Sequence, residues 1–210
     1  MLQQTYHVKR SKRVLVMDDI KNAIRKVNGH VMSNQKVIEF ITPYGNGEQE
    51  ILIANLSLMY SQAGERVVIL DTKFNSTAFS STFNVTTQYG LSDFLSHTRI
   101  GISNIIESVP NQNIDLISAG KITNSKTNNL IDDPRMETLL VNLKESYDRV
   151  LINVPKINVR SGTSNQRLYD ISDVSFLICD IGTPKRILVK TMNVLSRWKV
   201  NVAGYISVKK

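Results

Sequence analysis

The chain has 210 residues, of which 41% are hydrophobic and 21% are charged. This balance is typical of a globular protein and excludes an intrinsically disordered one. The longest apolar runs, such as residues 174–179, have the length of a strand, and none approaches the ~18 residues that a membrane-spanning helix needs. Residues 1–6 lack the apolar core of a secretory signal, and the single cysteine, Cys179, allows no disulfide within the chain. These features predict a cytoplasmic protein.

The formal net charge is +8, and the basic residues gather near the two ends of the sequence. One cluster comprises Lys9, Arg10, Lys12 and Arg13, and the other comprises Lys185, Arg186, Lys190, Arg197, Lys199, Lys209 and Lys210. Such charge is explained either by an anionic partner, such as nucleic acid or lipid headgroups, or by a solvated surface. The first cluster precedes an expected helix, so contact with an anionic membrane surface and a flexible basic arm stand as equal alternatives.

Strand and helix patterns alternate along the chain. We expect a first helix at about residues 18–32, and apolar, β-branched strands at residues 36–42, 66–71, 114–118, 149–154, 174–180 and 200–208. Helical patterns occupy residues 51–63, 135–146 and 185–199. Gly64 is placed to end the first of these three, while Pro134 and Pro184 are each expected in the first turn of the other two.

The order and composition of these elements predict the fold. Nearly continuous hydrophobicity in the strands is what a parallel sheet covered on both faces requires. Repeated strand–helix–strand order therefore predicts an α/β fold, with a doubly wound, mainly parallel sheet and helices on both faces. No linker rich in Gly, Pro or Ser divides the chain. We expect a basic arm and helix over residues 1–35 that form one globular unit with an α/β domain over residues 36–210.

The segment between the first strand and the next helix has the position of a phosphate-binding loop. Gly45, Asn46 and Gly47 would let backbone N–H groups converge, and the helix N-terminus would add positive potential. A phosphate loop, however, ends in Gly-Lys-Ser/Thr, and this segment contains no lysine. Glu48 and Glu50 stand there instead. They stabilise a helix N-terminus but would repel a triphosphate.

The stretch at residues 51–79, ILIANLSLMYSQAGERVVILDTKFNSTAF, resembles the bacterial tyrosine kinases of capsule and exopolysaccharide operons, which belong to the P-loop ATPases. In that family the loop helix reads A-N-L-A and then A-Q-x-G, and the following strand ends in L-I-D-x-D-x-R-x-P. Further matches follow in order: GLSDFL at 90–95, ISAG at 117–120, YDRVLINVP at 147–155 and ISDV at 171–174. The resemblance covers about residues 19–208. It implies a P-loop NTPase-like fold, with ATP and Mg²⁺ as the family's cofactors.

The family's functional positions are largely replaced in this chain. Its loop lysine falls on Gln49 and its magnesium-binding Ser/Thr on Glu50 when no gap is placed in the loop. The first acid after the second strand is kept as Asp71, but the second acid becomes Lys73 and the Walker B aspartate becomes Asn153. Mg²⁺ prefers carboxylate oxygens, and phosphoryl transfer depends on cations around the phosphates. We therefore interpret the chain as a catalytically degenerate relative, without a cofactor, in which these positions are remnants of the nucleotide loop.

The resemblance also implies a setting for such a protein. It predicts a regulatory or scaffold role in polysaccharide synthesis or export, at the inner face of the plasma membrane. The expected partner is a transmembrane chain-length modulator or an active kinase subunit, and the chain is a candidate homo-oligomer. Binding to nucleic acid is not expected. No metal site is expected either, because His7, His30 and His97 are scattered without the spacing of metal ligands.

Two alternatives remain at this level. The first is a divergent but active tyrosine autokinase or ATPase, in which Asp71 acts as the base and Lys73 reaches the phosphates. The competing structural interpretation, which we favour, makes Asp71 a strand-end acid that caps the next turn. The second alternative is a DNA-binding partition-type protein, suggested by the charge of +8. It ranks last because partition ATPases also need a loop lysine.

Overall fold

The computed structural model describes residues 17–43, 48–74, 76–121, 130–157, 166–180 and 182–208. They contain a seven-stranded sheet with the order β3-β4-β2-β5-β1-β6-β7. The strands are β1 (Val37–Ile41), β2 (Val67–Asp71), β3 (Glu107–Ser108), β4 (Ile114–Ile117), β5 (Arg149–Asn153), β6 (Val174–Asp180) and β7 (Val202–Val208). All neighbours are parallel except β3 and β4. The predicted doubly wound, mainly parallel α/β fold is confirmed.

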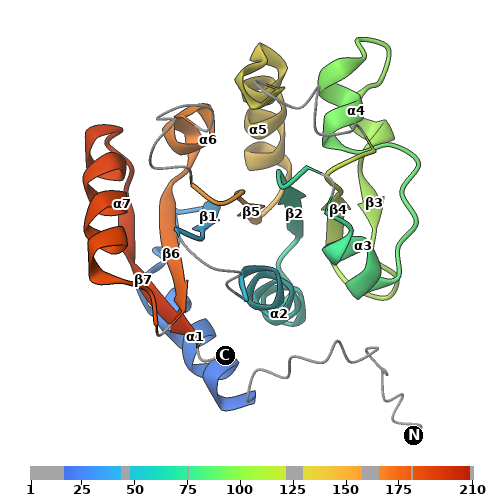
Figure 1. Ribbon diagram of the computed structural model, residues 1–210. Helices are drawn as coiled ribbons and strands as arrows, with labels where there is room; N and C mark the ends of the chain where they lie inside the picture. Colours follow the sequence, from blue (N-terminus) through green and yellow to red (C-terminus); the bar gives the residue numbers. More distant parts are fainter. Residues whose placement is uncertain are drawn as a thin grey trace, which may run out of the picture.

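Helices cover both faces of this sheet (Figure 1). They are α1 (Met17–His30), α2 (Gln49–Gln62), α3 (Ala78–Phe83), α4 (Leu91–Ser96), α5 (Pro134–Ser146), α6 (Gln166–Ile171) and α7 (Lys185–Arg197), with 3-10 turns η1 (Ile102–Asn104) and η3 (Leu130–Asp132). α1, α2 and α3 lie on one side of the strands, and α4 to α7 lie on the other (Figure 1). No helix within the described ranges is long and apolar enough to cross a membrane.

Two apolar clusters, one on each face, hold the layers together. In β1, Ile38 and Phe40 join the cluster that includes α1 and α2, whereas Val37 and Ile41 join the cluster beneath α5 and α6. This alternation is the two-residue period of a strand, here with apolar side chains on both faces. It explains why the sequence of each central strand reads as a continuous apolar run.

Helix ends follow from local chemistry, with one difference from the sequence prediction. Asp133 accepts a hydrogen bond from the Arg135 backbone at 2.9 Å, and Pro134 occupies the first helical position of α5 as predicted. Gly64 follows α2 with a φ of +89°, the left-handed conformation that ends helices. Pro184, predicted inside the first turn of α7, is instead its N-cap, because its ψ of 130° is extended.

Four short elements were not predicted from the sequence. α3, α4 and α6 have six residues each and β3 has two, so none contains enough residues to display a helical or strand period. The antiparallel edge strand β3 follows η1 and pairs with β4 through Glu107–Leu116 and Ser108–Asp115. Of these elements, α3, α4 and β3 lie on the β4 side of the sheet, and α6 lies near β6 (Figure 1).

One carboxyl group lies inside the sheet without a charged partner among the described residues. Glu39, in the middle of β1, is fully buried, and the Ser175 hydroxyl on β6 donates to its Oε2 at 3.0 Å. Its Oε1 has no hydrogen-bond partner in the described ranges. Burial raises the pKa of Glu39 to about 7. The neutral acid is therefore the form that the fold prefers.

This carboxyl group predicts a fall in stability with rising pH. A folded-state pKa raised above the unfolded value stabilises the protein at low pH, and that stability is lost as pH rises through about 7. We expect Glu39→Gln to remove up to about 3 kcal/mol of the loss in unfolding free energy between pH 5 and pH 8. Urea denaturation at both pH values measures it, with the exposed Glu145→Gln as control. A Glu39→Gln variant that keeps the whole pH dependence would contradict the prediction.

Candidate functional site

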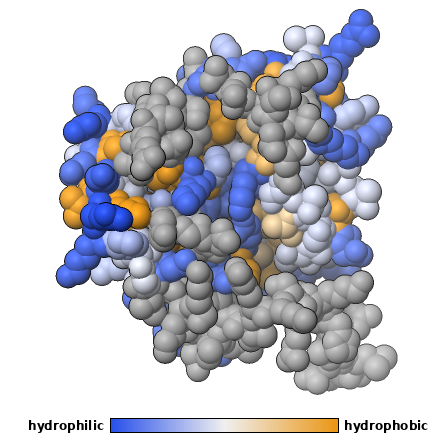
Figure 2. Space-filling view, viewed as in Figure 1, coloured by the Kyte–Doolittle hydropathy of each residue, from blue (hydrophilic) through white to orange (hydrophobic). Residues whose placement is uncertain are grey.

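The candidate site lies at the carboxyl ends of β1, β5 and β2, which are neighbours in the sheet. Ligands of open α/β sheets bind at this edge. The structure brings together five predicted site residues: Gln49, Glu50, Asp71, Lys73 and Asn153. In the space-filling view, hydrophilic side chains occupy the centre of the face shown in Figure 1, between the two helical layers (Figure 2).

The loop before α2 is only partly described. Gly45, Asn46 and Gly47, predicted to cradle phosphate, lie outside the described residues, as does Tyr44. Glu48 is the N-cap residue of α2 and is partly buried. The geometry of the site is therefore built from the residues that flank this loop.

Gln49, in the first turn of α2, is the centre of a buried hydrogen-bond network. Its side chain is 3% exposed, and its Oε1 accepts a hydrogen bond from the Thr42 hydroxyl at 2.7 Å. Its Nε2 donates to Asn153 Oδ1 at 2.5 Å and to the carbonyl oxygen of Val154 at 2.9 Å. One neutral amide thus ties the start of α2 to the ends of β1 and β5.

Asn153 extends this hydrogen-bond network to Asp71 at the end of β2. Its Nδ2 donates to Asp71 Oδ1 at 2.8 Å, and the Lys73 backbone N–H donates to the same oxygen at 3.1 Å. The second contact is the geometry of an acid that caps a turn. Burial raises the pKa of Asp71 to about 7, although the bonds from Asn153 and Lys73 oppose the rise. The innermost groups of the site are therefore two amides and a carboxyl group that protonates readily.

An ion pair crosses the outside of the site. Lys73 Nζ lies 2.7 Å from Glu50 Oε1, and these side chains are 53% and 22% exposed. A half-exposed pair of this kind contributes roughly 0–1 kcal/mol to stability. Its main consequence concerns where Lys73 points. This side chain, which was predicted to reach a phosphate, is turned toward the Glu50 carboxylate.

The side chains present do not fit a magnesium–triphosphate group. Mg²⁺ takes carboxylate oxygens and substrate phosphates in an octahedral shell. The Asn153 oxygen accepts from Gln49, which leaves Asp71 as the one carboxyl group in the inner network. Across the described ranges, no group of three or more His, Cys, Asp or Glu side chains is arranged to hold a metal ion.

Two contributors to this site were not identified from the sequence. Thr42, just beyond β1, is 7% exposed and donates to Gln49, and Thr72 donates through its hydroxyl to the Asn153 carbonyl at 2.9 Å. Each threonine follows an apolar strand that ends at the carboxyl edge. That position is the signal that points to them, although it does not specify their partners.

The sheet order, the helix that follows β1 and the polar carboxyl edge define a P-loop NTPase-like fold. The kinase domain of the Escherichia coli tyrosine kinase ETK has this fold, with a TM-score of 0.77 and 18% identity over 100% of this chain and 85% of that chain. The chimeric protein CapA2B2 matches with a TM-score of 0.78 and 18% identity over 95% and 87% of the two chains. The septum-site protein MinD of Pyrococcus horikoshii, solved with Mg-ADP, matches with a TM-score of 0.63 and 17% identity, over 81% and 68%.

Sequence comparison identifies relatives that are named as tyrosine-protein kinases. A Klebsiella pneumoniae protein provisionally named as a tyrosine-protein kinase in the cps region is 30% identical over 112 residues, which are 53% of this chain and 15% of that protein. The tyrosine-protein kinase ptk of Acinetobacter johnsonii is 24% identical over 159 residues, 75% of this chain and 21% of that protein. The chain thus spans about a fifth or less of the length of these two relatives. No family model matches. The inferred resemblance is confirmed: the chain is a relative of proteins named as capsule-region tyrosine kinases.

The hydrogen bond between Gln49 and Asn153 predicts that charged substitutions at these two positions have coupled effects on stability. Gln49→Lys alone would bury an ammonium against the neutral Asn153, and Asn153→Asp alone would set a second carboxyl group beside Asp71. We expect each to lower the unfolding free energy by about 1–3 kcal/mol, because each leaves a buried polar group poorly paired. Together they form a lysine–aspartate pair, so the double variant should lose less than the sum by about 1 kcal/mol or more.

Urea denaturation of all four proteins at pH 7 measures this coupling. Gln62→Lys, at the exposed end of α2, is the matched control for adding a lysine to this helix. Strictly additive losses in the double variant would show that Gln49 and Asn153 are not energetically linked.

Proposed function

We propose that this chain is a catalytically degenerate relative of the capsular and exopolysaccharide tyrosine kinases. In this proposal it acts as a regulatory or scaffold subunit in polysaccharide synthesis or export. The observation that carries the proposal is the hydrogen-bond network of Gln49, Asn153 and Asp71. These side chains occupy, with their own atoms, the edge where a P-loop ATPase holds phosphates and magnesium.

The electrostatics of the network support a loss of phosphoryl transfer. Kinases and ATPases neutralise the transferring phosphoryl group with a lysine and with Mg²⁺, and each such cation is worth orders of magnitude in rate. Gln49 is neutral, and its amide donates to Asn153 and Val154. Lys73 is paired with Glu50. Neither Gln49 nor Lys73 therefore supplies a cation that is directed at a phosphate.

The retained fold supports a role in binding partners. The strands are buried between two apolar clusters, which hold the helical layers to the sheet on both faces. The proposed partner is a transmembrane chain-length modulator or an active kinase subunit, at the inner face of the plasma membrane. Self-association belongs to the same proposal. The basic cluster proposed to meet anionic lipid, Lys9 to Arg13, lies outside the described residues.

One observation favours a second candidate, a divergent active kinase or ATPase. The raised pKa of Asp71, about 7, suits a general base that takes a proton from a tyrosine hydroxyl near neutral pH. This candidate requires Lys73 to leave Glu50 for the phosphates. It also requires Mg²⁺ to bind where Asn153 supplies an amide instead of a carboxylate.

Calorimetry with ATP and ADP, with and without Mg²⁺, separates the two candidates. We expect no heat of binding at millimolar nucleotide and no tyrosine phosphorylation by the purified chain, because positions 49, 50 and 153 lack the lysine, hydroxyl and acid that hold Mg-ATP. Micromolar, Mg²⁺-dependent affinity that weakens in Asp71→Ala would instead establish the active candidate.

A reconstructed site tests the same proposal in the opposite direction. The variant Gln49→Lys/Glu50→Thr/Asn153→Asp restores the lysine, hydroxyl and acid of the family pattern and releases Lys73 from its carboxylate. If the site is a degenerate nucleotide site, we expect Mg-ATP affinity to rise at least about tenfold over the unmodified chain. Gln62→Lys serves as a control for the added positive charge. A reconstructed protein that stays inert to nucleotide would mean that the substitutions at these three positions are not what removed binding.

A further inference from the structure

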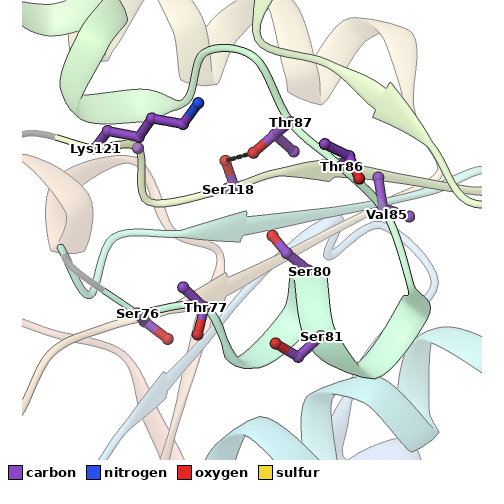
Figure 3. A pocket seen from close by; sticks show the side chains of 10 residues that line it. Ser76, Thr77, Ser80, Ser81, Val85, Thr86, Thr87, Ser118 and Lys121 are labelled. Carbon is purple, nitrogen blue, oxygen red and sulfur yellow. Dashed lines mark hydrogen bonds between the residues drawn. The ribbon is translucent and has the colours of Figure 1, made fainter.

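A cavity opens at the carboxyl edge of the sheet, on the other side of β2 from Gln49. It has a volume of about 310 Å³ and lies between α3 and the segment that follows β4 (Figure 3). This volume is at the lower end of the range of about 300–1,000 Å³ for small-molecule sites. None of the five residues of the amide network and its ion pair lines this cavity.

Hydroxyl groups dominate the lining. Seven of the ten lining residues that the structure describes are serine or threonine, and among these ten Val85 is the one with a large apolar side chain. Ser118 donates to Thr87 Oγ1 at 3.0 Å, the bond drawn in Figure 3, so the hydrogen of the Thr87 hydroxyl is directed elsewhere. Within the described residues, the hydroxyls of Ser80 and Thr86 make no hydrogen bond with protein groups. The lining therefore offers several hydroxyls that can both donate and accept.

One wall of the cavity is rigid. Gly120 has a φ of +89°, and a Cβ there would lie 2.2 Å from the Ser92 hydroxyl. A Cβ on Gly90 would lie 2.4 Å from the Gly120 nitrogen, so the two segments pack backbone to backbone. Asp93 Oδ2 accepts hydrogen bonds from the backbone of Gly90 at 2.9 Å and of Lys121 at 3.3 Å. The wall that presents Ser118 and Lys121 is therefore formed before any ligand arrives.

The charge of the lining selects for an anion. Among the described residues that line the cavity, Lys121 is the one that is charged, and none carries a carboxylate. No aromatic side chain lines it either, so the described lining offers no surface on which a base would stack. A ligand that matches both properties carries several hydroxyls and one negative group.

We propose that the cavity between α3 and the segment after β4 binds a small anionic sugar. The hydroxyl lining exchanges hydrogen bonds with the ring hydroxyls, and Lys121 pairs with a phosphate or carboxylate on the sugar. Both anions share the same recognition chemistry. The inference does not depend on the proposed function, since the cavity and the amide network have separate linings.

Calorimetry on the full chain tests the proposal with four probes: glucose 1-phosphate, glucuronate, glucose and inorganic phosphate. We expect saturable binding of at least one anionic sugar, about tenfold tighter than of glucose or of phosphate alone, because charge and hydroxyls are recognised together. The tighter of the two anionic probes identifies the preferred anion. Equal affinity for phosphate and glucose 1-phosphate would overturn the sugar assignment, as would no binding of either anionic sugar.

Two variants place the binding in this cavity. Lys121→Gln should weaken the anionic sugar about tenfold, to the level of glucose, whereas Lys190→Gln on the exposed face of α7 should not change it. Ser80→Phe puts a ring into the cavity at a partly exposed position and should abolish binding of every sugar probe, with circular dichroism as the check on folding. Undiminished binding in a folded Ser80→Phe protein would overturn the location.

ATP titrated into the sugar-saturated chain tests whether this cavity is separate from the nucleotide edge. Displacement of the sugar by ATP would show that the two ligands share a site and would overturn the proposal of a separate one.

Discussion

The Gln49 side chain is the contact on which the carboxyl edge depends. A single buried amide joins Thr42, Asn153 and Val154, and it does so without a charge. A lysine in this place would bring an ammonium that only a bound phosphate or a nearby carboxylate compensates. Burying such a charge without a partner costs several kcal/mol, whereas a satisfied amide pair costs little. Neutral Gln49 and neutral Asn153 are therefore physically matched, and together they let the edge close without a ligand.

The absence of charge on Gln49 and Asn153 also bears on the pKa of Asp71, the acid at the inner end of the network. Asp71 receives a hydrogen bond from Asn153 but faces no buried cation among the described residues, so burial prevails and its pKa rises to about 7. Lys73, the nearest basic residue in the chain, pairs outward with Glu50. Burial thus sets the direction of this shift, and the hydrogen bond from Asn153 opposes it.

How much of this was predictable depended on whether a feature is local in the sequence. The long strands and α2, α5 and α7 followed from apolar runs, helical periods and terminal Gly or Pro, each of which acts within one element. The positions of Gln49 and Asn153 at one edge followed from parallel-strand topology together with the family resemblance. The burial of Glu39 did not, because a strand with both faces covered gives no sign of which polar side chain faces the core. The hydroxyl cavity was not predictable either, since Ser80 and Ser118 come from separate elements and carry no periodic signal.

The carboxyl edge is therefore divided at β2 into two parts with different chemistry. On the β5 and β1 side, protein side chains fill the space and satisfy one another, so a ligand would have to break several buried hydrogen bonds to enter. On the β4 side, a rigid glycine-bounded wall faces α3 and leaves hydroxyls and one lysine open to solvent. One part of the carboxyl edge is therefore filled by protein side chains, and the other part has room for a ligand.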